Sequence, residues 1–553
     1  MAYLLGYTRE PIDNVHYDPR LAYSLHLALS EDGITYQGLN HNSGVLFAKA
    51  TENEDGSLNP MSLADPRIFA REDGTFGVVA QRILGDGGSD DSSQGKVLVW
   101  TTKDFLVYEE LGLYDPAEVP MITETADPKT LELKEMQGAI LCNSIRIPEA
   151  TADRLRKKLL TPVNVGVRVP EQKKAKCPGC IRSVKAEVLY SDGTVVERPV
   201  DWQYEKIDFT RPGAYEITGQ VRQKHFAFPV ALHRADPDVC YWQGKYYFIS
   251  TNDEDNNHTL YARVSDTLEG LVDAEDHLIL DSDTYEDIGN LLWAPEFHEI
   301  NGRLYIFHAA TPDPFFHEES HIMCLKEGGD PVCKEDWSRP VRIVRKDGSD
   351  LCEAGRVITL DMTCFLWEGE YYVSWSQREF KPKDLGAWLY IAKLDPEKPW
   401  MLASAPVVLS KPDYGWGNNH TFVEEGPFAL PVENKLYLTF SAAAVDTSYV
   451  VSYLEAEHGK DILDPANWRK NNYPILTSRS VEGEFGTGHN AYVVDEDGLI
   501  WNTYHARPGE EGVRSSGIRR VHLDIDGAPM LDVTEEKDLK DEYRTVKMTV
   551  IIE

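Results

Sequence analysis

A unit of roughly 45 to 65 residues recurs through the second half of the chain, and it constrains the fold more than any other feature. Each copy opens on a short motif, continues into an aromatic, strand-like run and reaches a turn such as Gln243-Gly244 or Asn301-Gly302. The openings are Ala235-Asp236-Pro237, Trp293-Ala294-Pro295-Glu296, Leu360-Asp361, Glu425-Gly426-Pro427 and Gly488-His489-Asn490. Units of this size are too long for solenoid turns and match a four-stranded propeller blade. They predict a five-bladed β-propeller over residues 226–535.

The rest of the chain also predicts strands, so the expected fold class is all-β. Alternating β-branched and aromatic runs end in Asp-Gly, Asn-Gly or Glu-Gly turns, while long helical periodicity is scarce. Residues 1–118 contain blade-like runs and are expected to form an N-terminal β module. Residues 119–225 resemble a bacterial immunoglobulin-like β-sandwich, with an SDG turn and Trp202. Residues 536–553 are expected to form a C-terminal strand that packs on another module.

Charge, hydropathy and cysteine content exclude several classes of protein. The formal net charge of −35 argues against a nucleic acid or an anionic membrane as partner. No run approaches the ~18 apolar residues of a membrane span, and the first residues lack a basic leader region. We therefore expect a cytoplasmic protein, or a secreted one if a leader was removed. The eight cysteines are scattered and form no dense disulfide framework.

The stretch Cys177-Pro178-Gly179-Cys180 has the spacing of half a zinc site or of a redox pair. No second pair or histidine stands close to it in sequence. A turn that holds two incidental thiols is the simpler interpretation.

Three acids occupy the openings of three units and are therefore expected to meet at the propeller shaft: Asp236, Asp361 and Glu425. Hydrolysis of a glycosidic bond needs one protonated carboxylic acid and one carboxylate. Glu425, followed by Gly426-Pro427 in an apolar setting, is the candidate acid, with its pKa raised. Asp236 is the candidate base, and Asp361 would orient Glu425 and hold up its pKa. The alternative is that each acid only bonds local backbone at a strand start.

Five segments carry a family resemblance: RADPDVCYWQGKYYF, LLWAPEFHEINGRLYIFHAA, ITLDMTCFLWEGEYYVSWS, VEEGPFAL and GTGHNAYVVDEDGLIWNTYHAR. In this order they resemble glycoside hydrolase family 43. The resemblance implies a five-bladed propeller that hydrolyses arabinofuranosides or xylosides with inversion. It implies that Asp236 activates a water and that Glu425 protonates the leaving group, with the carboxyl groups of these two residues ~6.5–9.5 Å apart. It also implies that Asp361 modulates the pKa and the orientation of Glu425.

The same resemblance implies further site residues. Trp293 is expected to wall the sugar pocket, and an arginine late in the last blade is expected to clamp a sugar hydroxyl. Arg514 is preferred for that role over Arg519 and Arg520. His489 is expected at the shaft, near a structural Ca²⁺ or other ion, or else as a hydrogen-bonded structural residue. No cofactor is expected to be required.

One more acid competes for the role of base. Asp65 lies in Ala64-Asp65-Pro66-Arg67, which repeats the motif around Asp236. No second Glu-Gly-Pro lies within residues 1–118, so Asp236 is preferred.

The leading hypothesis is an exo-acting α-L-arabinofuranosidase that acts on plant-derived oligosaccharides, with β-xylosidase activity as a second activity. A non-catalytic carbohydrate-binding propeller or adhesin and an endo-arabinanase remain alternatives, and the oligomeric state is open.

Overall fold

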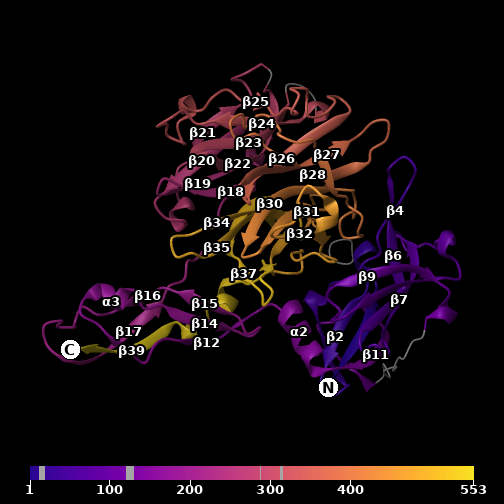
Figure 1. Ribbon diagram of the computed structural model, residues 1–553, viewed down its shortest axis with the longest axis horizontal. Coiled ribbons are helices and arrows are strands. Elements are labelled where there is room, and N and C mark those ends of the chain that lie inside the picture. The colour runs from indigo at the N-terminus through magenta and orange to yellow at the C-terminus, as the bar shows by residue number, and fades with distance from the viewer. Residues whose placement is uncertain (12–18, 120–129, 287, 312–314) are drawn as a thin grey trace.

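The computed structural model describes residues 1–11, 19–119, 130–286, 288–311 and 315–553. Its elements are almost all strands, which confirms the predicted all-β class. In Figure 1 the propeller fills the centre, the immunoglobulin-like sandwich projects to the lower left and the N-terminal unit lies to the right.

The propeller has five antiparallel blades, as the repeats predict. Its innermost strands contact one another in a closed ring, in the order β18, β22, β26, β30, β34 and back to β18. The predicted turns Gln243-Gly244 and Asn301-Gly302 have positive φ at both residues, as tight hairpin turns require. The strands are β18 (Arg234–Trp242), β19 (Lys245–Asn252), β20 (Thr259–Ser265) and β21 (His277–Asp281) in blade 1; β22 (Asn290–Ile300), β23 (Arg303–Thr311), β24 (Glu319–Cys324) and β25 (Val341–Arg342) in blade 2; β26 (Val357–Trp367), β27 (Glu370–Glu379), β28 (Gly386–Lys393) and β29 (Val407–Ser410) in blade 3; β30 (Glu424–Val432), β31 (Lys435–Ala442), β32 (Val450–Glu457) and β33 (Trp468–Lys470) in blade 4; β34 (Glu484–Val494), β35 (Ile500–Pro508) and β36 (Ser515–Arg520) in blade 5.

The repeated openings are β-bulges. In every inner strand the pairing register shifts at the opening motif. Each bulge holds a residue in the left-handed region, namely Asp236, Ala294, Asp361, Gly426 and His489. Bulges re-aim side chains, and left-handed non-glycine residues cluster at functional sites. The sequence repeat is therefore a repeated backbone device that turns side chains toward the shaft.

The N-terminal unit contains two larger sheets, and it is longer than predicted. Strand β11 pairs along the length of β1, and α2 buries Ala152, Leu155 and Leu159 in the same core. The predicted boundary at residue 118 is wrong, because the partner of β1 lies far away in sequence. The elements are β1 (Ala2–Arg9), β2 (His26–Ser30), β3 (Thr35–Gly38), β10 (Glu132–Lys134) and β11 (Ala139–Ile147) in one sheet; β6 (Met61–Ala70), β7 (Phe76–Leu84), β8 (Val97–Thr102) and β9 (Tyr108–Tyr114) in the other; the hairpin β4 (Thr51–Glu52) and β5 (Leu58–Asn59); and the helices α1 (Pro19–Ala22) and α2 (Glu149–Leu159).

The sandwich packs two sheets over an apolar core that includes the predicted Trp202. The C-terminal strand β39 pairs with β17 and β13, which confirms that the end of the chain packs on another module. Cys177 precedes the short helix α3 (Pro178–Arg182) and Cys180 lies in its first turn; both are free thiols, with 3.4 Å between their sulfur atoms. The sheets are β12 (Asn164–Arg168), β14 (Ala186–Tyr190) and β15 (Val195–Arg198), then β13 (Gln172–Lys174), β39 (Thr545–Ile552), β17 (Gly213–Val221) and β16 (Val200–Trp202).

A buried ion cluster joins the sandwich to the propeller. Asp538 ends the short helix α4 (Glu535–Asp538), which follows the hairpin of β37 (His522–Leu523) and β38 (Pro529–Met530). Its carboxylate accepts hydrogen bonds from Arg520 of blade 5 at 2.6 Å and from Arg198 of the sandwich. The Tyr190 hydroxyl donates to the same carboxylate at 2.8 Å.

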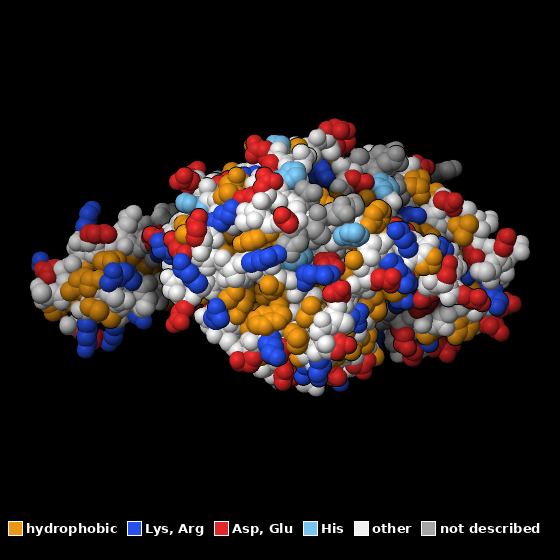
Figure 2. Space-filling model, turned by 90° about the horizontal axis from the view of Figure 1, so that it is seen from above, with side chains coloured by type: hydrophobic (Ala, Val, Ile, Leu, Met, Phe, Trp, Pro, Cys, Tyr) orange, Lys and Arg blue, Asp and Glu red, His pale blue; other side chains and the backbone are white. Residues whose placement is uncertain are grey.

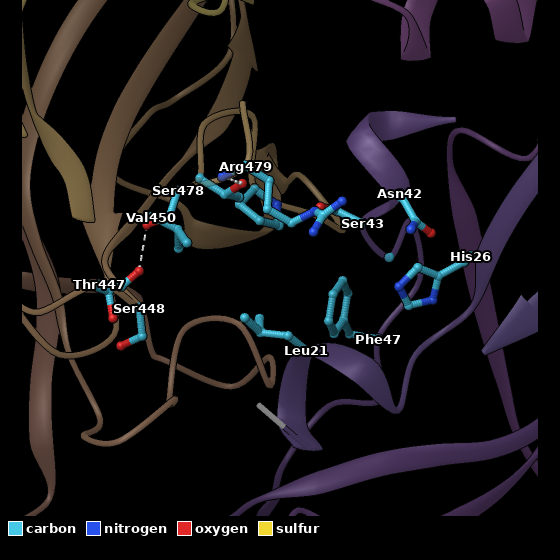
Figure 3. A pocket seen from close by; sticks show the side chains of 13 residues that line it. Leu21, His26, Asn42, Ser43, Phe47, Thr447, Ser448, Val450, Ser478 and Arg479 are labelled. Atoms are coloured by element: carbon cyan, nitrogen blue, oxygen red, sulfur yellow. Dashed lines mark hydrogen bonds between the residues drawn. The ribbon is translucent and has the colours of Figure 1, made fainter. Parts of the chain in front are cut away.

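The N-terminal unit shares a continuous apolar core with blades 3 and 4, in which Leu27 and Phe47 belong to the same cluster as Trp416 and Phe440. A cavity of about 30 Å³ lies at this junction. Figure 3 shows side chains of both units, such as Phe47 and Val450, on its two sides. None of the described residues that line it is acidic, and its volume suits about one water molecule. It is a packing gap at an interface and too small for a sugar.

Acidic and basic side chains are interspersed on the face seen in Figure 2. Among the described residues, no helix combines the length and apolar character needed to cross a bilayer.

Candidate active site

One cavity of about 400 Å³ opens where the bulged strands begin, and all five blades contribute to its wall. It brings together every site residue favoured from the sequence. Its lining residues are Asp236, Asn257, Trp293, Phe315, Ile358, Leu360, Asp361, Arg378, Ala387, Val423, Glu425, Val445, His489, Arg507 and Arg514.

Nitrogen atoms of three side chains surround the carboxylate of Asp236. Its Oδ1 lies 3.3 Å from Arg514 Nη1, 3.2 Å from His489 Nδ1 and 3.0 Å from His505 Nδ1. Burial raises the pKa of Asp236, but the charges of His489 and Arg514 outweigh it and hold the pKa well below its usual value. Arg514 is itself fixed by Asp253, at 2.9 and 2.7 Å. The geometry suits a base that stays ionised at neutral pH.

Glu425 has the opposite character. Burial raises its pKa to about 7, against the lowering effect of the Tyr449 hydroxyl, which donates to Oε1 at 2.8 Å. The charge of Asp236 contributes to this rise. Two carboxyl groups of one cavity therefore have pKa values pushed apart, the condition for one acid and one base.

Asp361 contacts the segment that carries Glu425. Its Oδ2 accepts a hydrogen bond of 3.0 Å from the backbone N–H of Gly426. Burial, with the charges of Glu425 and Asp236, holds the pKa of Asp361 well above its usual value. The sequence predicts that Asp361 raises the pKa of Glu425 by charge repulsion. The two acids do repel each other, since the charge of Glu425 raises the pKa of Asp361, and the charge of Asp236 raises the pKa of Glu425. The contact of Asp361 is with the backbone beside the acid.

An aromatic wall lies on the blade 2 side of the cavity. The Trp293 indole N–H donates to Asn257 Oδ1 at 2.8 Å, which fixes the ring plane. Phe315 packs against Trp293 with 5.9 Å between ring centroids. Flat aromatic faces suit the C–H surface of a sugar.

Of the three competing arginines, only Arg514 lines the cavity. Arg519 pairs with Glu484, and Arg520 pairs with Asp538.

Besides Asn257 and Phe315, several polar residues in or near the cavity were missed from the sequence. The Tyr449 hydroxyl donates to Glu425, the Asp236 backbone N–H donates to His505 Nδ1 at 3.3 Å, and Arg378 and Arg507 line the wall. His505 and Arg507 alternate along β35, so the two-residue period of a strand places both on one face. Arg507 Nη2 donates to the Val445 carbonyl at 2.8 Å, while its buried Nη1 has no partner among the described residues.

Asp65 is excluded from this site by its position. It lies in β6 with the same bulge and positive φ as Asp236, so β6–β9 form a lone blade-like sheet. Its side chain is 49% exposed and pairs with Arg67 at 3.1 Å. It does not line the cavity.

The described residues of the N-terminal unit support a loop of the cavity without lining it. Lys383 Nζ donates to Asp55 Oδ2 at 3.0 Å and to Ser57 Oγ at 2.7 Å, both in the β4–β5 hairpin. The next residue, Asp384, accepts two hydrogen bonds from Arg378, at 3.1 and 2.6 Å. The hairpin thus contacts the loop that fixes a cavity arginine.

The side chains around His489 do not fit a protein-ligated metal ion. Among the described residues, no three His, Cys, Asp or Glu side chains are grouped to hold one. Ca²⁺ takes about six to eight oxygen ligands. His489 has only ring nitrogens to offer, and its Nδ1 already contacts Asp236 Oδ1. Metal binding at His489 stays a prediction, and no chemical step depends on it.

Comparison with known proteins agrees with this geometry. Residues 226–529 match the family described as glycosyl hydrolases family 43, and residues 184–224 match a bacterial Ig-like domain of group 4. The extracellular exo-α-(1→5)-L-arabinofuranosidase of Streptomyces chartreusis is 32% identical over 51% of this chain and 83% of its own length. The enzyme of the same name from Streptomyces avermitilis is 30% identical over 55% of this chain and 62% of its own.

A crystal structure of α-L-arabinofuranosidase from Lactobacillus brevis is 28% identical, with a TM-score of 0.48, over 55% of this chain and 94% of that one. The family match covers more than half of this chain. The chain belongs to glycosyl hydrolase family 43 and is a glycoside hydrolase.

Proposed function

We propose that this enzyme is an exo-acting, inverting α-L-arabinofuranosidase that releases terminal arabinofuranose from plant-derived oligosaccharides. We propose β-xylosidase activity as a second activity of the same site. One observation carries the proposal: an ionised Asp236 and a Glu425 with a pKa of about 7 share one aromatic-walled cavity. The names of the two Streptomyces relatives support arabinofuranose as the sugar.

The proposed reaction is a single displacement. Asp236, oriented by Arg514 and His505, takes a proton from a water as the water oxygen attacks the anomeric carbon. Glu425 gives its proton to the glycosidic oxygen as the bond to that oxygen breaks. Asp361 holds the backbone beside Glu425 through the Gly426 N–H. Both carboxyl groups then exchange their protons with solvent.

The shape of the site supports exo action. A cavity of about 400 Å³ lies within the usual range for small-ligand pockets and is walled by all five blades. A terminal sugar would fill such a pocket, with the rest of the chain at the mouth. An endo-arabinanase needs an open cleft along which a chain continues in both directions.

The test combines substrates with variants. Wild-type enzyme is assayed in parallel on aryl arabinofuranoside, xyloside and galactofuranoside, and proton NMR records the anomer released first. We expect arabinofuranoside cleavage with inverted configuration, abolished in Asp236→Asn. Inactivity on all three substrates would overturn the proposal. Sugar binding without turnover, equal in wild type, Asp236→Asn and Glu425→Gln, would favour a non-catalytic binding propeller.

The names of the Streptomyces relatives also describe extracellular enzymes. They support secretion of this chain over the cytoplasmic location expected from the sequence.

A further inference from the structure

A chain of four aromatic rings runs from the cavity wall to the protein surface. Trp293 and Phe315 line the cavity. Phe315 packs edge-on against Phe380, with 5.4 Å between centroids, and Phe380 packs against Phe316 at 5.1 Å and 90°. Phe315 and Phe316 lie in one turn between β23 and β24, and Phe380 directly follows β27. The rings therefore join the loops of blades 2 and 3 at one side of the mouth.

The outermost ring, Phe316, is 40% exposed. Its backbone is fixed, because its carbonyl accepts a hydrogen bond of 2.8 Å from the Gly355 N–H. Lys381 Nζ lies 5.6 Å from the Phe316 centroid, and the Arg378 guanidinium lies 4.9 Å from that of Phe380. An exposed apolar ring with cations beside it resembles a sugar-binding surface, in which rings meet C–H faces and cations meet hydroxyls.

We propose that Phe316 is the platform of a leaving-group subsite, which binds the sugar on the far side of the scissile bond. The inference rests on the proposed function. When a terminal sugar lies between Asp236 and Glu425, the remaining oligosaccharide has to leave through the mouth. The aromatic wall continues there from Phe315 to Phe316. The occupant is therefore the next sugar of the same substrate.

The subsite makes activity depend on the leaving group. Stacking on one aromatic ring is worth about three- to tenfold in affinity. The experiment compares kcat/KM on linear arabino-oligosaccharides with kcat/KM on methyl α-L-arabinofuranoside, whose methyl group is too small to reach Phe316. We expect Phe316→Ala to lower the first value by about three- to tenfold and to leave the second within about twofold. Phe316→Tyr should restore the first value.

Trp400→Ala is the matched control, because Trp400 is 42% exposed and follows β28 at the opposite end of blade 3. It should change neither value. An equal loss of both activities in Phe316→Ala, or no loss on oligosaccharides, overturns the subsite. If the proposed function is wrong, the wild-type enzyme will not cleave arabinofuranosides, which is a different result from either of these. If wild type cleaves xylosides instead, the methyl xyloside and xylo-oligosaccharide pair decides the role of Phe316 in the same way.

Discussion

Replacement of Tyr449 by phenylalanine tests how the cavity sets the protonation of the acid. The Tyr449 hydroxyl donates to Glu425 Oε1 at 2.8 Å. A donor at this position stabilises the ionised carboxylate more than the neutral acid, so it lowers the pKa of Glu425. The ring stacks on His505 with 5.5 Å between centroids, and phenylalanine keeps that packing. Tyr449→Phe should therefore raise the pKa of Glu425.

The size of the effect follows from the strength of the bond. A hydrogen bond to a charged group is worth about 1.5–3 kcal/mol, and 1.36 kcal/mol corresponds to one pH unit. Burial places the pKa of Glu425 at about 7 in the wild type, so catalysis should fall as pH rises through that value. In the variant, the alkaline limb should move to about pH 8–9. At pH 8 the variant then keeps at least about half of its plateau activity, and wild type about a tenth.

The assay is kcat/KM from pH 4 to pH 9 on an arabino-oligosaccharide, with released arabinose measured after quenching. A sugar leaving group is required, because a nitrophenolate departs without a proton and hides the titration of the acid. The acid limb should stay where it is, since Asp236 remains ionised far below neutral pH in both proteins.

Tyr437→Phe is the matched control, because its hydroxyl is buried in the same blade without a hydrogen-bond partner in the described structure. Its pH profile should match wild type. An alkaline limb in Tyr449→Phe that stays in place or moves to lower pH would refute the assignment of Glu425 as the acid tuned by Tyr449.

Three further predictions concern catalysis, the supporting loop and the domain junction. Glu425→Gln should lower kcat/KM on arabino-oligosaccharides by about 10²- to 10⁴-fold but much less on dinitrophenyl arabinofuranoside; equal losses in steady-state kinetics would contradict acid catalysis. Lys383→Ala frees the loop that fixes Arg378, and should raise KM about two- to threefold at unchanged kcat; Lys393→Ala, which breaks a surface pair with Glu370 in the same blade, should change neither. Asp538→Ala leaves two buried arginines unpaired and should cost about 3–5 kcal/mol, seen as a lower midpoint of thermal unfolding; an unchanged midpoint would show that the cluster is not stabilising.

Much of the fold was predictable because the signals were local. The blade repeat marks where each inner strand bulges, and the acids Asp236, Asp361 and Glu425 sit at those bulges. The boundary at residue 118 failed for the opposite reason. The strand that completes the N-terminal sheet is β11, and its pairing with β1 spans the whole unit. A hydrogen-bonded ladder between distant segments leaves no periodicity that marks its partner.

The sequence by itself determined the five blades, the all-β class and the three acids that enter one shaft, because strand alternation and the bulge motif are local properties of the chain. Only the tertiary structure decided what each acid faces. The nitrogens around Asp236 come from β34, β35 and the turn before β36, and the hydroxyl on Glu425 comes from the loop before β32. A pKa depends on distance and burial, and closure of the blades brings these groups into contact, which no single segment encodes.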